Sequence, residues 1–80
     1  MSREQIMQAI LSNISDNLDD VDPTDIDTSL SMADYGANSL DVIEIVSCTM
    51  RDLRIKIPRA ELSKIESIDG FASALLEHAA

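Results

Sequence analysis

The chain of 80 residues has few of the side chains that support catalysis or metal binding. It contains no Trp, one Phe, one Tyr, one Cys and one His. Cys48 has no partner for an internal disulfide, His78 lies close to the end of the chain, and no Gly-rich phosphate loop is present. A calcium loop starting at Asp20 would need Gly and Glu where the sequence has Asp25 and Ser31. The sequence therefore offers no candidate catalytic residue and no candidate metal site.

Long uncharged apolar runs are also missing, which argues against a membrane-spanning helix. No apolar stretch preceded by basic residues stands at the N-terminus, as a secretory signal would require. Together with the unpaired Cys48, these features predict a cytoplasmic protein. A content of 45% hydrophobic residues and the lack of internal repeats predict one small domain spanning residues 1–80.

Basic side chains are missing from more than half of the chain. Between Glu4 and Met50 there are ten acidic residues and no Lys or Arg, and the net charge is −9. Such a charge disfavours nucleic acid and anionic membranes, so we expect protein partners and a monomer. Five of the six basic residues stand within the next fourteen positions: Arg51, Arg54, Lys56, Arg59 and Lys64.

Helical periodicity of apolar residues predicts helices over about 3–17, 39–53, 59–65 and 68–78. Ser2 with Gln5 forms the pattern of a capping box, Pro58 can open the short third helix, and Ser67 can cap the last one. Residues 18–38 are rich in Asp and lack this periodicity, so we expect a long loop. Its apolar residues are expected to hold it to the core: Val21, Ile26, Leu30, Met32 and Tyr35. The predicted fold is all-α, a small up-and-down bundle of three main helices plus one short helix, with a long loop after the first helix.

Ser39 stands where this loop ends and the second helix begins. Gly36 allows a turn that a β-carbon would resist, and Asn38 is a good helix N-cap. If Asn38 caps the helix, the Ser39 hydroxyl is left exposed beside unpaired backbone N–H groups, where a phosphodiester would be favoured. The alternative is that Ser39 is itself the N-cap and has no further role.

The second helix has a predicted core face made of Val42, Ile45, Val46, Thr49 and Leu53. Leu40 instead projects on the polar side with Glu44, Ser47 and Arg51, and Ile43 lies on its flank. These exposed apolar residues can form a small docking face rimmed by charge, or they can be ordinary surface residues.

The segment Gly36-Ala37-Asn38-Ser39-Leu40-Asp41, followed by Ile43-Glu44-Ile45-Val46, resembles the attachment motif of acyl carrier proteins. The resemblance extends over nearly the whole chain, since that family shares the helix order, the acidic loop with a Pro-x-x-Ile segment (Pro23, Ile26) and the Ile-Pro entry to a short third helix.

The resemblance implies that Ser39 is esterified with phosphopantetheine, whose thiol holds acyl groups as thioesters. The chain would then be a phosphoprotein and a carrier, not an enzyme. Leu40, Ile43 and Glu44 would contact the phosphopantetheinyl transferase and the acyl-handling enzymes, and Asp41 would face the transferase near its cofactor. The full set of expected docking residues is Leu40, Asp41, Ile43, Glu44, Ser47, Arg51, Arg54 and Arg59.

The sequence departs from the family pattern in two places; the first is harmless, since Asn caps a helix as well as Asp, and the second argues against docking on the basic patches of fatty acid enzymes. Asn38 replaces the Asp or His that many carriers have before the serine, and the second helix ends in Met50-Arg51-Asp52-Leu53-Arg54, where carriers of fatty acid synthesis tend to be acidic. The stretches 49–53 and 57–62 are most similar to freestanding carriers of polyketide pathways, in particular the donor carriers of β-branching cassettes. Their expected partners are an acyltransferase, a ketosynthase-like decarboxylase that makes the acetyl carrier, and a hydroxymethylglutaryl synthase-like enzyme that passes the acetyl unit on.

Three other interpretations stay open from the sequence. The chain could be a fatty acid carrier or a general polyketide carrier, which share the same Ser39 chemistry. A peptidyl or aminoacyl carrier fits the acidic surface less well. A noncatalytic helical adaptor would bind partners through Leu40 and Ile43 and leave Ser39 unmodified.

Overall fold

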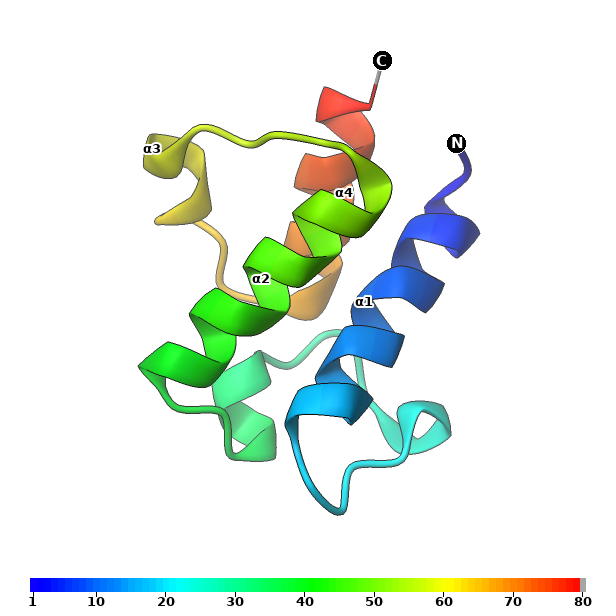
Figure 1. Cartoon of the computed structure of the whole chain (residues 1–80), viewed down its shortest axis with the longest axis vertical. Helices are drawn as coiled ribbons and strands as arrows, with labels where there is room; N and C mark the ends of the chain where they lie inside the picture. Colours follow the sequence, from blue (N-terminus) through cyan, green and yellow to red (C-terminus); the bar gives the residue numbers. More distant parts are fainter. Residues whose placement is uncertain (80) are drawn as a thin grey trace.

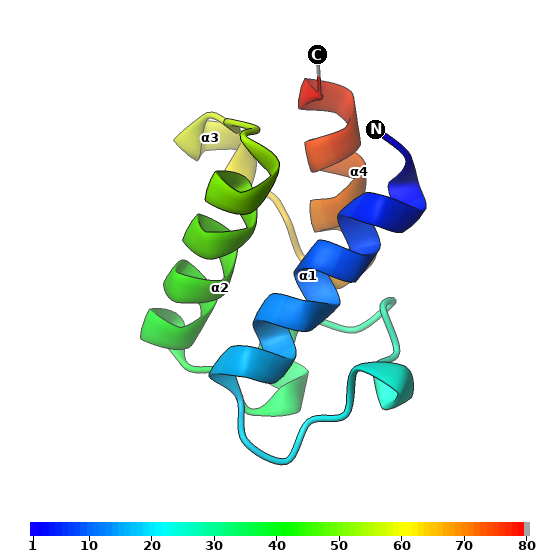
Figure 2. The same cartoon turned by 45° about the vertical axis from the view of Figure 1, so that its right-hand side comes forward.

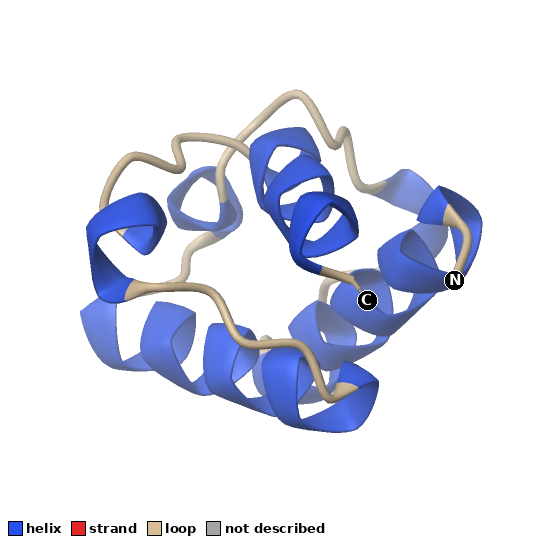
Figure 3. Ribbon diagram, turned by 90° about the horizontal axis from the view of Figure 1, so that it is seen from above, coloured by secondary structure: helices blue, strands red, loops and turns tan. Residues whose placement is uncertain are grey.

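The computed structural model describes residues 1–79, and within them the secondary structure is entirely helical (Figure 3). This confirms the predicted all-α fold, with three main helices, one short helix and a long loop after the first. The elements, in chain order, are α1 (Arg3–Asn17), η1 (Pro23–Asp25), η2 (Met32–Tyr35), α2 (Ser39–Leu53), α3 (Arg59–Leu62) and α4 (Ile68–His78), where η denotes a 3₁₀ helix.

Helix α1 packs against both α2 and α4, and the loop between α1 and α2 crosses one end of the bundle (Figures 1 and 2). The start of α2 lies at this loop end, whereas α3, the end of α2 and both chain termini lie at the opposite end (Figure 1). Over residues 1–79, no helix combines the length and the apolar character needed to cross a membrane.

Large aliphatic side chains from the three long helices form the core. Their spacing along each helix places them on one face, and each fully buried side chain of this size contributes about 1.5–3 kcal/mol to folding. Phe71 is the one aromatic residue in the core. The largest fully buried side chains are Ile6, Ile10, Ile14, Ile45, Thr49, Ile68, Phe71 and Leu75.

A buried polar contact joins α1 to α2. The side-chain amide of Asn13, only 8% exposed, donates to Thr49 Oγ1 at 3.1 Å and to Asp52 Oδ2 at 3.2 Å. Thr49 in turn donates to the Ile45 carbonyl at 2.7 Å. Because a buried polar group is stable only with a partner, this contact favours one register of α1 against α2.

Backbone hydrogen bonds tie the long loop to the start of α4. The N–H groups of Ile68 and Asp69 donate to the carbonyls of Leu30 and Thr28, at 2.9 and 2.8 Å. The prediction that the Leu30 side chain is held in the core is wrong, because it is 41% exposed. The loop is held at this point by its main chain, which a hydrophobicity pattern does not report.

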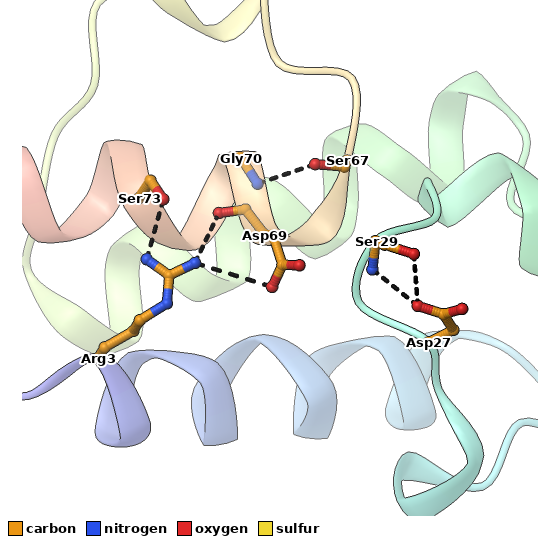
Figure 4. A network of polar contacts seen from close by, with 7 residues as sticks. All are labelled: Arg3, Asp27, Ser29, Ser67, Asp69, Gly70 and Ser73. Carbon is orange, nitrogen blue, oxygen red and sulfur yellow. Dashed lines mark hydrogen bonds and ion pairs between the residues drawn. The ribbon is translucent and has the colours of Figure 1, made fainter.

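Figure 4 shows the side chains around this junction. Arg3 on α1 donates to Ser73 Oγ at 2.9 Å and to the Asp69 carbonyl at 3.2 Å. In the loop, the hydrogen bonds that the Ser29 hydroxyl and N–H donate to Asp27 hold the pKa of that carboxyl below its ordinary value. The Arg3 contacts connect α1 to α4, and the Asp27–Ser29 contacts lie within the loop.

The remaining loop contacts match the sequence expectations in part. Met32 is buried, and Val21, Ile26 and Tyr35 are half-buried against the core, as expected.

The two 3₁₀ helices in the loop and the early end of α3 differ from the predictions. The rest of residues 59–65 forms a turn after Leu62, and α3 is linked to α4 by a 2.5 Å hydrogen bond between Glu61 Oε2 and His78 Nε2.

Replacing Asn13 by Ala should lower the free energy of unfolding by about 1–3 kcal/mol, because Thr49 and Asp52 lose a buried partner. Urea denaturation would measure the change, with the exposed Gln8→Ala substitution on the same helix as the control. Equal unfolding midpoints for the two variants would show that the buried contact does not stabilise the helix pair.

Candidate functional site

The chain reaches Ser39 through a tightly turned segment. Helix η2 begins with a reciprocal cap between Ser31 and Asp34 and ends at Gly36, whose φ of 91° lies in the left-handed region. Space around Gly36 is open enough for a β-carbon, so glycine is favoured there by the backbone angle alone. The Gly36 N–H donates to the Ala33 carbonyl at 3.0 Å and closes the turn.

The two residues before Ser39 fix where α2 begins. Ala37 is buried, and its N–H donates to the Met32 carbonyl at 3.2 Å. Asn38 then adopts an extended conformation, and its Oδ1 accepts from the Asp41 N–H at 2.8 Å. The Asp41 carboxylate returns the bond by accepting from the Asn38 N–H at 3.0 Å. This capping box confirms Asn38 as the N-cap and Ser39 as the first helical residue.

The side chain of Ser39 is exposed and has no capping role. Within residues 1–79 its hydroxyl makes no hydrogen bond, so the alternative in which Ser39 caps the helix is wrong. The first turn of α2 carries partial positive charge from its N–H groups, which favours an anion next to this hydroxyl. Asp41 was expected to face a partner enzyme, but the structure also gives its carboxylate an internal role in the cap.

The other predicted docking residues separate into two groups along α2 and α3. Leu40 and Ile43, 77% and 60% exposed, lie within the first turns of α2 together with the exposed Glu44 and Ser47. We call these four residues the docking face. Arg51, Arg54 and Arg59 are also exposed, but they lie toward the other end of α2 and on α3. Only the first group is close to Ser39 along the helix.

A mostly apolar cavity of about 280 Å³ opens beside the first half of α2. The sequence does not predict this cavity, because Val42 and Val46 have the spacing of core residues and nothing in the sequence shows that they are only half-buried. The cavity lies among η2, α2, α3 and the start of α4, and it is lined by Ser31, Met32, Ala33, Val42, Ile43, Val46, Leu62, Ile65, Glu66, Ser67 and Phe71.

Cys48 lies about two and a half turns along α2 from Ser39, and its thiol is hydrogen-bonded to charged neighbours. Its thiol is 3.3 Å from Glu44 Oε1, and the Arg51 guanidinium is 3.4 Å from the sulfur. The hydrogen bond to Glu44 raises the pKa of the Cys48 thiol, and burial raises it further, while Arg51 acts in the opposite direction. These contacts disfavour the thiolate, which is the reactive form of cysteine.

The two neighbouring residues Asn38 and Ser39 should respond differently to truncation. Asn38→Ala should lower the free energy of unfolding by about 1 kcal/mol through loss of the cap, whereas Ser39→Ala should change it by less than about 0.5 kcal/mol. Urea denaturation of both variants tests this. A larger loss for Ser39→Ala than for Asn38→Ala would mean that the serine caps the helix.

Removal of Glu44 should make Cys48 more reactive. Glu44→Ala lowers the thiol pKa toward its ordinary value, so alkylation by iodoacetamide near pH 8 should become severalfold faster. Asp16→Ala, an exposed acidic residue on α1, is the control for net charge. Alkylation at the same rate in the two variants would show that Glu44 does not control the thiol.

Comparison with known proteins gives two matches that cover almost the entire chain. Residues 1–79 match the family model described as "Highly reducing polyketide synthase sdgA, C-terminal ACP domain". The chain is also 31% identical, over 77 residues, to the polyketide biosynthesis acyl-carrier-protein AcpK of Bacillus subtilis (strain 168), covering 96% of this chain and 94% of that protein. Members of this family carry acyl groups, normally on a phosphopantetheine arm, and do not catalyse the reactions themselves. These two matches agree with the geometry around Ser39, and the chain belongs to the acyl carrier protein family.

Proposed function

We propose that this protein is an acyl carrier of polyketide biosynthesis, that Ser39 holds its phosphopantetheine arm, and that it supplies acetyl units in β-branching. The exposed Ser39 hydroxyl, freed from capping by Asn38 and Asp41, is the observation that carries the proposal. The two matches support the pathway class, since both are described by their names as polyketide proteins.

The site residues fit a phosphodiester on Ser39. Oγ is exposed to solvent, the first turn of α2 favours negative charge, and the backbone before it is held by Gly36 and Ala37. The arm supplies a thiol that holds the acyl group as a thioester. The protein contributes the anchoring oxygen, the position of that oxygen at the helix end and the surface that partners recognise.

Loading of Ser39 requires another enzyme. The bond from Ser39 Oγ to the phosphorus of the arm forms as the pyrophosphate bond of coenzyme A breaks, adenosine 3′,5′-bisphosphate leaves, and the serine proton passes to a base. Asp41, the carboxylate nearest in sequence, already accepts a hydrogen bond from the Asn38 N–H. No hydrogen bond joins the Ser39 hydroxyl to a side-chain base within residues 1–79, so the phosphopantetheinyl transferase would supply the base.

The docking face supports recognition by that transferase and by the acyl-handling enzymes. Leu40 and Ile43 are large apolar side chains left in water, and Glu44 and Ser47 supply a polar rim. Partners of this surface would be the transferase, an acyltransferase, a ketosynthase-like decarboxylase and a hydroxymethylglutaryl synthase-like enzyme. The cavity beside Val42 and Ile43 is apolar enough to receive a short acyl chain carried by the arm.

Coexpression with a broad-specificity phosphopantetheinyl transferase, followed by intact-mass measurement, tests the attachment site. We expect the mass to rise by one phosphopantetheine, and the rise to be absent in Ser39→Ala. Ser12→Ala, an exposed serine of α1 away from the docking face, is the control and should still be loaded. A protein that stays at its unmodified mass would instead favour a helical adaptor without a prosthetic group.

A further inference from the structure

Residues 58–66 run along the outside of the bundle between two points that are fixed in the core. Ile57, just before them, is 3% exposed, and Ile68, shortly after them, is fully buried. Within the segment itself only Leu62 and Ile65 are half-buried, and the other residues are exposed. We call residues 58–66 the strap; it includes α3, which is yellow in Figure 1. The strap is therefore anchored at both ends and loosely packed in its middle.

Helix α3 has little of its own to keep it folded. It consists of four residues, and its N-cap, Pro58, has no side-chain oxygen with which to cap it. One turn of helix is unstable in isolation, because fixing its backbone costs more free energy than its few hydrogen bonds contribute. The Ser63 hydroxyl donates to the Ala60 carbonyl at 2.8 Å, but this bond lies within the strap. The position of α3 therefore depends on contacts with the rest of the fold.

A single hydrogen bond joins the strap to another element within residues 1–79. Glu61 Oε2 on α3 lies 2.5 Å from His78 Nε2 on the last turn of α4. A carboxylate only accepts, so His78 Nε2 is the donor. The side chains of Glu61 and His78 are 46% and 26% exposed, so the bond has the modest strength of a pair in contact with water. Apart from this bond, the strap is held by the apolar side chains of Leu62 and Ile65.

The strap forms one wall of the apolar cavity beside α2. Leu62, Ile65 and Glu66 line the cavity from the strap, and Val46 of α2 and Phe71 of α4 line it from other elements. A strap that moved outward would take Leu62 and Ile65 away from this cavity and would bring Val46 into contact with water. The bond that positions α3 therefore also positions the cavity wall.

We propose that Glu61 and His78 form a latch that keeps the strap closed over the cavity, and that loss of their bond opens the cavity to apolar molecules. The inference does not rest on the proposed function, since it concerns the unmodified chain. The opening is local, because Ile57 and Ile68 stay in the core while α3 moves between them. A pair of this strength lets the closed form open often, which a wall requires if an apolar group is to enter behind it.

Amide hydrogen exchange in the strap of the unmodified protein tests the latch. The Ser63 N–H donates to the Arg59 carbonyl at 3.1 Å and exchanges when α3 opens. Glu61→Ala should make this exchange about two- to fivefold faster, as expected for loss of a half-exposed pair. Glu77→Ala removes an exposed carboxylate next to His78 in sequence and leaves the bond intact, so it is the matched control. Equal exchange rates in the two variants would overturn the latch.

A double variant separates a latch from two independent contributions. His78→Ala should speed the Ser63 exchange about as much as Glu61→Ala, and the combination should be no faster than either, because all three variants lose the same bond. Effects that multiply in the double variant would show that the two side chains act separately, which contradicts the proposal. In the unchanged protein the Ser63 N–H should also exchange faster than that of the buried Ile10. Equal protection would mean that α3 opens only when the whole bundle unfolds.

Alkylation of a cysteine placed in the cavity tests whether the latch controls access to it. In a Cys48→Ser background, Val46→Cys puts the only thiol of the chain on the cavity wall. N-ethylmaleimide, a small neutral reagent, should alkylate this thiol about two- to fivefold faster when Glu61→Ala is added than when Glu77→Ala is added. The same alkylation rate in both would show that the strap does not close the cavity. Circular dichroism of each variant checks that the helices are intact.

Discussion

The reciprocal cap between Asn38 and Asp41 is the interaction on which the proposed attachment site depends. Each residue accepts a hydrogen bond from the backbone N–H of the other, so α2 begins without using the hydroxyl of Ser39. The serine is therefore placed in the first turn, where the positive end of the helix favours a phosphodiester, while its oxygen stays in water. Anchoring of Ala37 in the core keeps this arrangement in a fixed place on the molecule.

The rest of the fold holds α2 in position and leaves its outer side uncovered. Ile45 and Thr49 bury one side of the helix, and the Asn13 contact joins it to α1. Leu40 and Ile43 remain exposed, at a cost in hydrophobic stabilisation that a surface kept for partners can explain. Helix α3 has a single turn and is linked to α4 by the hydrogen bond between Glu61 and His78. This short helix forms one wall of the cavity through Leu62.

The sequence predicted the helix bounds well where side chains cap the helices. The Ser2–Gln5 pattern and Asn38 give α1 and α2 the same starting residues in sequence and structure. It did not predict η1 and η2, because three- and four-residue helices depend on local caps such as Ser31 with Asp34 and leave no periodicity. The cavity depends on how α3 sits over half-buried valines, and the attachment of the loop at Leu30 runs through the backbone. Neither the cavity nor the backbone attachment of the loop can be predicted from the residue types in the sequence.

Amide hydrogen exchange at Asp41, followed by NMR in the unmodified protein, tests the central claim most directly. We expect this N–H to be protected, to remain protected in Ser39→Ala, and to exchange rapidly in Asn38→Ala, because Asn38 Oδ1 is its acceptor. Loss of protection in Ser39→Ala with protection kept in Asn38→Ala would show that Asn38 is not the cap. The serine oxygen would then be the helix cap and would not be free for a prosthetic group.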